Sequence, residues 1–530
     1  MKFAYVMLVQ EPVSGAKSLR PTQARQPEPP RGKILDADGN ILAMSVRKKS
    51  LAANPRQIED PWSVAQKLSP ILNTPAPDLY KKLSKNRYFV WLERKLSKKK
   101  LSSIKDLDLR GLRFKPEYNR VYPQGRLAAQ VLGFVGVDNR GLSGIEKQFD
   151  PVLSRASGDT SPINRTAGTL NDDVSVRLTI DQTIQHIVEE EMRTTVEKEN
   201  PDNIMVVAME PETGKIRALA NWPSFNPNRF WDYKQSKRRN RVVSNVFEPG
   251  STLKLMTLSI GLAEQAYSSS AAFNCKGYYY LPKARHTLHC YSKHGRLTIP
   301  EIIIQSCNVG TVKAANEIDP TTYYKSLRDF GFGNWTGVRL PGEASGRLRR
   351  PSEWSSMTQS VMAIGQGIST TALQLTNALA SIVNGGKLMK PRIVASMNKG
   401  NGETDRVESF KIRRTTPEAV AADMKTYMEK VVTRGTGKQA ALEEYQLAGK
   451  TGTAQKPKEG ETGYYQDQFL ASFIGFGPVG NAELVVSVIV DNPKKGRYGG
   501  EVAGPLFKRI MKRSLDYLDS QKDDYRVASH

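Results

Sequence analysis

The sequence predicts an α+β protein in which a smaller N-terminal domain precedes one large domain. Three observations predict this class. Strand patterns alternate with helical patterns along the chain, strands come from both ends of the second region with mostly helices between them, and a polar stretch at residues 151–172 separates the two regions. The chain has 530 residues, 39% of them hydrophobic, which excludes a disordered or collagen-like protein.

The first region begins with a hairpin. Lys33–Leu35 and Ile41–Ala43 flank the turn Asp38-Gly39-Asn40, and Asp-Gly is a strong turn dipeptide. Residues 60–110 repeat Lys and Leu at spacings of three and four, which is typical of helices. We therefore expect residues 31–172 to form one domain of short strands and helices.

The second region opens with a strand pattern, continues with helices and returns to strands. Its predicted elements are a strand at Val174–Ile180, a helix to Glu199, a hairpin of Ile204–Met209 and Lys215–Leu219, a strand pair at Ala471–Phe476 and Leu484–Asp491, and a helix at Pro505–Leu518. We expect one large domain over residues 173–520 and a tail over residues 521–530.

The N-terminal segment, residues 1–30, is expected to be a juxtamembrane segment. Residues 3–9 are apolar, but seven residues are too few to span a bilayer, and no run in the chain approaches 18 apolar residues. No small-residue cleavage site follows, so the segment is not predicted to be a signal peptide. It is expected to be the end of a truncated anchor, or the start of a strand or helix.

Charge is concentrated in the first third of the chain. The net charge is +25, and residues 1–150 carry 28 Lys and Arg against 14 Asp and Glu. This excess predicts an anionic surface as a neighbour, although ordinary solubilising charge explains it equally well. The sequence lacks zinc-finger spacing, an aromatic RNA-binding signature and a basic coiled-coil region, so no nucleic acid is expected.

The first motif that carries chemistry is Ser251-x-x-Lys254, which opens a helical pattern after Pro249. Residues three apart share a helical face. A serine is a nucleophile only when a base takes its proton, and a lysine is that base only when burial or positive neighbours keep it neutral. The motif therefore predicts a Ser251 nucleophile with Lys254 as its base.

Two further motifs follow this pair along the chain, Ser306-x-Asn308 and Lys450-Thr451-Gly452. The motifs Ser-x-x-Lys, Ser-x-Asn and Lys-Thr-Gly, in this order, are typical of penicillin-interacting serine enzymes. Ser306 is expected to relay a proton and Asn308 to bind a substrate amide. Lys450 and Thr451 are expected to hold a carboxylate, and Gly452 to let substrate approach the strand. The backbone N–H groups of Ser251 and Thr453 are expected to form an oxyanion hole.

With these motifs the chain resembles a class B penicillin-binding protein, a monofunctional peptidoglycan D,D-transpeptidase, of the septal or cell-division type. The resemblance extends along nearly the whole chain. It is carried by Arg31-Gly32-x-Ile34-x-Asp36-x-x-Gly39, Arg120-x-Tyr122-Pro123, Gly133-x-x-Gly136, Gly141-x-x-Gly144-x-Glu146-x-x-Phe149-Asp150, Leu178-Thr-Ile-Asp181, Gly331-Phe-Gly333, Gly365-Gln-Gly367-Ile-Ser, Asn384-Gly-Gly386 and Ala471-Ser-Phe-Ile-Gly-Phe476.

The resemblance implies an N-terminal pedestal, or dimerisation-like, domain, followed by a serine β-lactamase-like transpeptidase domain with a central antiparallel sheet. It also implies attack by Ser251 on a stem peptide ending in D-Ala-D-Ala, transfer to a neighbouring amine, and acylation of the same serine by β-lactams. Glu146 is expected to be structural. No cofactor is expected.

The implied location is the cytoplasmic membrane, with the catalytic domain on the extracytoplasmic, periplasmic side. The implied partners are a septal glycosyltransferase, other division proteins and the membrane surface. Asp36-Ala37 stands where the family usually has Asp-Arg, and the family's N-terminal membrane helix is reduced to residues 3–9. The alternatives are an elongation- or sporulation-type enzyme, a serine β-lactamase, or a penicillin-binding sensor or scaffold without turnover.

A Cys/His segment lies between the first two motifs, and we expect it to have free thiols and no metal. A zinc site is the first alternative, with Cys275, His286, His289 and Cys290 as the candidate ligands and His294 nearby. A Cys275–Cys290 disulfide is the second alternative. Cys307, inside the second motif, is expected to be a buried helix residue.

Overall fold

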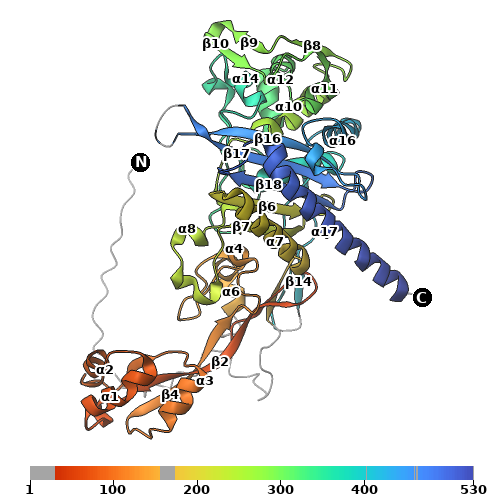
Figure 1. Ribbon diagram of the computed structural model, residues 1–530. Helices are drawn as coiled ribbons and strands as arrows, with labels where there is room; N and C mark the ends of the chain where they lie inside the picture. Colours follow the sequence, from red (N-terminus) through yellow and green to blue (C-terminus); the bar gives the residue numbers. More distant parts are fainter. Residues whose placement is uncertain (1–29, 155–173, 401–402, 459, 461–462, 529–530) are drawn as a thin grey trace, which may run out of the picture. The chain divides into compact units, whose positions relative to one another are not determined.

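The structure is a computed structural model that describes residues 30–154, 174–400, 403–458, 460 and 463–528 (Figure 1). The expected juxtamembrane segment up to residue 29, the polar boundary at 155–172 and the last two residues of the expected tail lie outside the described residues. None of the helices in the described ranges combines the length and hydrophobicity that a bilayer span requires.

The described residues form two compact units, and their boundaries differ from the expected domains. One unit contains Lys48–Glu117, and the other contains Pro30–Arg47 together with the chain from Tyr118 onward. Residues of the expected domain 31–172 therefore belong to both units, since its first strand pairs with the strand Ser175–Leu178 of the larger unit. The expected domain boundaries stay a prediction.

The smaller unit has a core of leucines and isoleucines from helices and short strands. Its elements are α1 (Pro61–Leu72), α2 (Ala76–Leu83), β3 (Val90–Glu93) and α3 (Lys98–Lys105), together with parts of β2 (Ile41–Ala53) and β4 (Leu112–Val121). Asp60 caps α1 by accepting from the backbone N–H groups of Trp62 and Ser63. The helical prediction for residues 60–110 is confirmed except at β3.

The predicted hairpin near residue 38 is confirmed, with a longer second strand. β1 (Lys33–Leu35) pairs antiparallel with β2 and parallel with β5 (Ser175–Leu178). β13 (Val394–Asn398) and β14 (Thr404–Arg406) extend this sheet beyond β5. The Asp36 carboxylate accepts from the backbone N–H groups of Asp38 and Asn40, which fixes the turn.

Three of the quoted N-terminal motifs meet around Glu146, which is fully buried on α5 (Gly144–Gln148). Arg31 Nε lies 2.5 Å and Arg120 Nε 2.6 Å from its two carboxylate oxygens. Arg31 also contacts Asp150 at 2.6 Å, on α6 (Asp150–Leu153). Burial alone would lower the pKa of Arg31, but Glu146 and Asp150 outweigh it and the pKa is raised.

A five-stranded antiparallel sheet is the centre of the larger unit (Figure 1). Its strand order is β16 (Ala448–Pro457), β17 (Tyr464–Gly477), β18 (Leu484–Asp491), β6 (Asn203–Met209) and β7 (Ile216–Trp222). The predicted strand pairs from both ends of the region are thus neighbours in one sheet, because β18 pairs with β6.

Helices cover both faces of this sheet. Alternate residues of β6 face opposite cores: Ile204 and Val206 pack with α7 (Gln182–Glu199) and α17 (Gly499–Ala528), whereas Met205 and Val207 pack in the core that holds α10 (Lys254–Ala263) and α15 (Ala372–Val383). The predicted final helix is confirmed but is longer than expected. It includes the described part of the expected tail.

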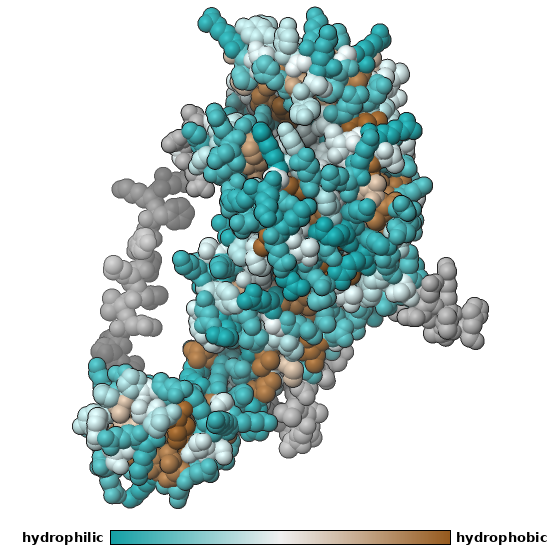
Figure 2. All heavy atoms as spheres, viewed as in Figure 1, coloured by the Kyte–Doolittle hydropathy of each residue, from teal (hydrophilic) through white to brown (hydrophobic). Residues whose placement is uncertain are grey.

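The remaining α-helices and strands, together with the 3₁₀ helix that carries Ser251, complete the larger unit. They are α4 (Ala129–Leu132), α8 (Gln235–Arg238), α9 (Arg241–Ser244), the 3₁₀ helix η4 (Gly250–Leu253), β8 (Ala272–Cys275), β9 (Tyr278–Leu281), β10 (His286–His289), β11 (Gly295–Thr298), α11 (Ile299–Ile304), α12 (Asn308–Asn316), α13 (Pro320–Asp329), α14 (Thr358–Ala363), β12 (Lys387–Met389), β15 (Lys411–Arg414) and α16 (Glu418–Thr433). On the face shown in Figure 2, hydrophilic residues cover most of the surface.

Candidate active site

The three predicted motifs line one cavity of about 500 Å³. Each comes from a different element: η4 and α10 for the first, the turn between α11 and α12 for the second, and strand β16 for the third. The cavity wall includes Ser251, Ser306, Asn308, Thr451 and Thr453. The structure therefore brings together residues that are up to 202 positions apart in the sequence.

Ser251 lies in η4, directly before α10. Gly250 precedes it with a φ of +56°, and its N–H donates to the carbonyl of Gly365 at 3.1 Å. An added Cβ on Gly365 would lie 2.1 Å from the Gly250 carbonyl oxygen, so only glycine permits this approach. The turn that presents Ser251 is thus held by backbone packing.

Lys254 is fully buried at the first position of α10. Its Nζ donates to the Ser306 carbonyl at 2.6 Å and to Asn308 Oδ1 at 2.6 Å, and it lies 3.4 Å from Ser306 Oγ. Burial lowers the pKa of Lys254 to about 8, against the opposing effect of Cys290 and Cys307. With this pKa about a tenth of the amine is neutral at pH 7, and only the neutral form can act as a general base.

Ser306 and Asn308 flank the short connection between α11 and α12. Ser306 has a φ of +55°, a backbone conformation that non-glycine residues rarely adopt. Asn308 uses both ends of its side-chain amide within the protein, since Oδ1 accepts from Lys254 and Nδ2 donates to the His289 carbonyl at 2.9 Å. Asn308 therefore positions Lys254 in addition to facing the cavity.

Lys450 approaches the same serine from β16. Its Nζ donates to Ser306 Oγ at 2.9 Å, so the Ser306 hydroxyl lies within hydrogen-bonding reach of both lysines. Burial, and then the positive charge of Lys254, lower the pKa of Lys450 well below its ordinary value. The Thr451 hydroxyl lies 2.7 Å from that of Thr436, which follows α16.

Thr453 and Gly452 continue β16 along the cavity. Thr453 Oγ1 accepts from the N–H of Gly499, the first residue of α17, at 3.0 Å. A Cβ on Gly452 would lie 2.4 Å from Ser472 Oγ and 2.8 Å from Thr252 Cγ2, so glycine is required here for packing between protein segments. The expected approach of substrate at Gly452 stays a prediction.

Several cavity residues were not predicted from the sequence. They are Tyr291, Gln305, Thr436, Lys438, Gln439 and the run Tyr498–Glu501. Tyr291 and Tyr498 form an edge-to-face pair with ring centroids 6.4 Å apart. A weak signal existed for Thr436 and Tyr498, because each lies beside glycines at the end or start of a helix.

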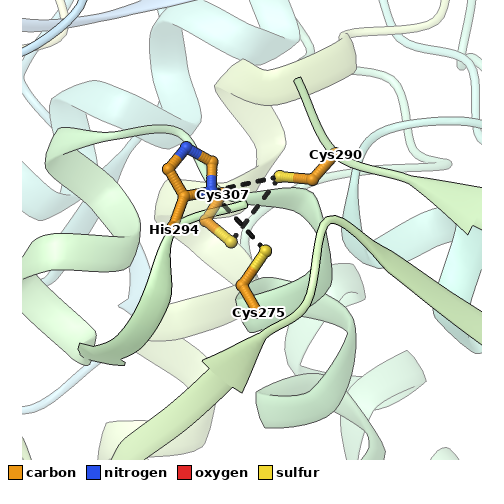
Figure 3. Close-up of side chains that lie close together, drawn as sticks. All are labelled: Cys275, Cys290, His294 and Cys307. Atoms are coloured by element: carbon orange, nitrogen blue, oxygen red, sulfur yellow. Dashed lines mark hydrogen bonds between the residues drawn. The ribbon is translucent and has the colours of Figure 1, made fainter. Parts of the chain in front are cut away.

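The Cys/His group that the structure assembles differs from the candidate zinc ligands. Cys275 and Cys290 do approach each other, but their companions are His294 and Cys307 (Figure 3). The candidate ligands His286 and His289 lie exposed on β10, outside the group. The three cysteines are free, so the alternative Cys275–Cys290 disulfide is not present. Cys307 is buried, as expected, and caps α12.

Comparison with known families assigns both parts of the chain. Residues 26–177 match the penicillin-binding protein dimerisation domain, and residues 204–512 match the penicillin-binding protein transpeptidase domain. The α+β class with an N-terminal dimerisation domain and a following transpeptidase domain is therefore confirmed.

Individual relatives match over most of the chain. Stage V sporulation protein D of Bacillus subtilis is 34% identical over 93% of this chain and 79% of that protein. The probable peptidoglycan D,D-transpeptidase PenA of Neisseria gonorrhoeae is 31% identical over 92% of this chain and 84% of its own. The peptidoglycan D,D-transpeptidase FtsI of Escherichia coli K12 is 29% identical over 95% and 86%.

Solved structures agree with these sequence matches. The crystal structure of penicillin-binding protein 3 from Mycobacterium tuberculosis, complexed with aztreonam, superposes with a TM-score of 0.74 and 27% identity, covering 93% of this chain and 97% of that one. The predicted enzyme class follows from the matched domains, and residues of all three motifs line the cavity. The chain belongs to the class B penicillin-binding proteins, and it is a peptidoglycan D,D-transpeptidase.

Proposed function

We propose that the cavity forms and resolves an acyl-enzyme on Ser251. Ser251 Oγ attacks the carbonyl carbon of the penultimate D-Ala of a stem peptide, and its proton passes to the neutral amine of Lys254. The C–N bond then breaks. Terminal D-Ala leaves with a proton that Lys254 returns through the Ser306 hydroxyl.

The second half of the reaction uses the same groups in reverse. An amine of a neighbouring stem attacks the Ser251 ester and gives its proton to Lys254. Ser251 Oγ leaves and regains that proton. The backbone N–H groups of Ser251 and Thr453 stabilise the oxyanion in both halves, while Lys450 and Thr451 hold the substrate carboxylate.

The observation that carries this proposal is the shared hydroxyl of Ser306. Lys254 Nζ lies 3.4 Å and Lys450 Nζ 2.9 Å from it, and no carboxylate neutralises either amine among the hydrogen-bond partners in the described residues. Two buried amines close to each other favour the neutral form of one of them, and the hydroxyl that both reach can pass a proton between them.

Fluorescent penicillin tests the assignment of the nucleophile. We expect covalent labelling of the wild-type chain and its loss in Ser251→Ala. Ser326→Ala, on α13, is the control that keeps full labelling. Unchanged labelling of a folded Ser251→Ala variant would reject Ser251 as the nucleophile.

For the cellular role, we propose cross-linking of the septal wall during division. The septal-type motifs Gly365-Gln-Gly367 and Ala471–Phe476 support it, as does the similarity to FtsI. A sporulation role is the second candidate, supported by the 34% identity to Stage V sporulation protein D. A fluorescent fusion to the chain should gather at mid-cell in vegetative cells, whereas appearance only in sporulating cells would favour the second candidate.

We further propose that the enzyme works at the extracytoplasmic side of the cytoplasmic membrane, with a septal glycosyltransferase and division proteins as partners. The charge of the smaller unit supports a membrane surface, because residues 48–117 carry 17 Lys and Arg against 7 Asp and Glu. Binding to vesicles with anionic lipid should weaken as salt increases and in a variant carrying Lys98→Glu and Lys99→Glu. Binding that is insensitive to salt would contradict this surface.

A further inference from the structure

All three cysteines of the chain meet at one point. Cys275 ends β8, Cys290 follows β10 and Cys307 precedes α12, so three separate segments bring them together. His294 joins them from the position directly before β11. Their sulfur atoms and one histidine nitrogen all lie within 4.8 Å of one another, and Figure 3 shows them pointing toward a common centre.

The separations fit the ligands of one tetrahedral zinc ion. With Zn–S near 2.3 Å and Zn–N near 2.0–2.1 Å, tetrahedral geometry requires about 3.8 Å between sulfurs and about 3.6 Å between sulfur and nitrogen. Cys290 Sγ lies 3.7 Å from Cys307 Sγ. His294 Nδ1 lies 3.4 Å from Cys290 Sγ and 3.6 Å from Cys275 Sγ.

The surroundings of these four atoms favour a metal as well. His294 Nε2 lies 3.0 Å from Ser292 Oγ, so a proton on Nε2 leaves the Nδ1 lone pair directed at the sulfurs. Backbone N–H groups of Asn308 and Gly310 donate to the sulfurs of Cys290 and Cys307 at 3.3 and 3.2 Å. Such donors stabilise negative sulfur, which is the form that binds a metal.

We propose that Cys275, Cys290, His294 and Cys307 form a structural zinc site. Four protein ligands fill a tetrahedral shell and leave no open position, as in sites that stabilise a fold. Zn²⁺ replaces the thiol protons when it binds, and no oxidation or reduction takes place.

The site has a structural consequence for the cavity, because Cys307 is the middle residue of Ser306-Cys307-Asn308. The metal would join this short connection to the ends of β8 and β10. Asn308 is already tied to that region through its N–H to Cys290 Sγ and its amide to the His289 carbonyl. The zinc would thereby hold Ser306 in its unusual backbone conformation beside Lys254 and Lys450.

Metal content tests the site directly. The full chain, purified with reductant and without chelator, should contain about one zinc per molecule by mass spectrometry of the elements. Cys275→Ser and His294→Ala should each lower this content at least tenfold. His286→Ala and His289→Ala are matched controls, since both histidines are exposed on the adjacent strand and should leave the zinc content unchanged.

A second measurement keeps the test decisive when a ligand variant fails to fold. Titration of the folded wild-type chain with a mercurial should release its zinc as the thiols are blocked, and growth with cobalt should give the absorption of tetrahedral cobalt with thiolate ligands. Folded protein with three reduced thiols that holds less than a tenth of an equivalent of zinc, and takes up none when Zn²⁺ is added, would overturn the proposal. A native disulfide between any two of the three cysteines would also overturn it.

The predicted effect on catalysis rests on the proposed function, whereas the zinc site does not. Cys275→Ser should label with fluorescent penicillin about ten- to a hundredfold more slowly than wild type, because Ser306 and Asn308 lose their anchor. Ser251→Ala should keep about one zinc while losing all labelling. Failure of the reaction and failure of the metal site therefore give different results.

Discussion

The larger unit contains two groups of buried charges with opposite arrangements. Around Glu146, two guanidinium groups and a carboxylate compensate one another, with Arg31 and Arg120 on its two oxygens. Around Ser306, two buried amines of the same sign approach one hydroxyl, and their hydrogen-bond partners are neutral oxygens.

The pKa shifts follow from this difference. The carboxylates of Glu146 and Asp150 raise the pKa of Arg31 although it is buried. Burial without a carboxylate partner lowers the pKa values of Lys254 and Lys450. The first arrangement fixes the fold and has no reactive member. The second stores an unfavourable electrostatic energy that makes an amine available as a base. Buried charge serves structure where it is paired and chemistry where it is not.

The largest expected effect is on Lys254. Replacement of this lysine by methionine should slow acylation by fluorescent penicillin about 10³-fold, because the general base is lost. The variant should remain at least as stable to urea as the wild type at pH 7, because an uncompensated buried charge is removed. Lys325→Met on α13 is the control. A large loss of stability in Lys254→Met would show that the buried lysine stabilises the fold, as the ion pairs of Glu146 do.

The next largest effect is expected at Glu146, and here the loss should be in stability. Glu146→Ala removes the carboxylate that Arg31 and Arg120 share, which leaves Arg31 with Asp150 and Arg120 with backbone carbonyls, and it should cost about 3–5 kcal/mol, measured by urea unfolding. Glu146→Gln keeps the shape and one acceptor, and should cost less. Folded protein of either variant should still be labelled at Ser251, and equal stability of the alanine variant and wild type would refute the structural role.

The pH dependence of acylation should follow Lys254. Its pKa is lowered to about 8, so the neutral, reactive form increases as the pH rises through that value. The rate of labelling should increase about tenfold between pH 7 and pH 9, and then level off. Stopped-flow measurement with a chromogenic β-lactam gives this profile. A rate that falls over the same range would exclude a neutral amine as the base.

The smallest effect is expected at Asp150, at the edge of the compensated group. Its side chain is 28% exposed and accepts from Arg31 at 2.6 Å and from the Gly141 N–H at 2.8 Å. Asp150→Asn should destabilise the protein by about 1 kcal/mol, because solvent screens the lost charge and one acceptor remains. If Asp150→Asn destabilised the protein as much as Glu146→Ala, burial would not determine how much each carboxylate contributes to stability.

Periodicity and turn dipeptides were sufficient to predict much of the fold. The β1–β2 hairpin, α7, the β6–β7 hairpin and the β17–β18 pair were all predicted, because each is a local pattern. The division of the chain into two compact units could not be predicted in this way. It depends on the pairing of β1 with β5, about 140 residues away, and local patterns contain no information on such pairings.

The site shows the same limit. Its three motifs are short and can be recognised in the sequence, but closeness in sequence favours His286 and His289 as companions of Cys275 and Cys290. In the fold the sulfur of Cys307, a residue of the second motif, lies beside Cys290 instead. Tyr291 and Tyr498 face the cavity from segments without any motif.

The division of the chain at Lys48 and Glu117 has an evolutionary consequence. Residues 48–117 are an insertion: the chain leaves the larger unit along β2 and returns along β4, and these two strands pair with each other. An inserted module with adjacent ends can be exchanged, lengthened or removed without breaking the host fold. Residues 48–117 can therefore change in length or sequence without altering the strands and helices that position Ser251, Ser306 and Lys450.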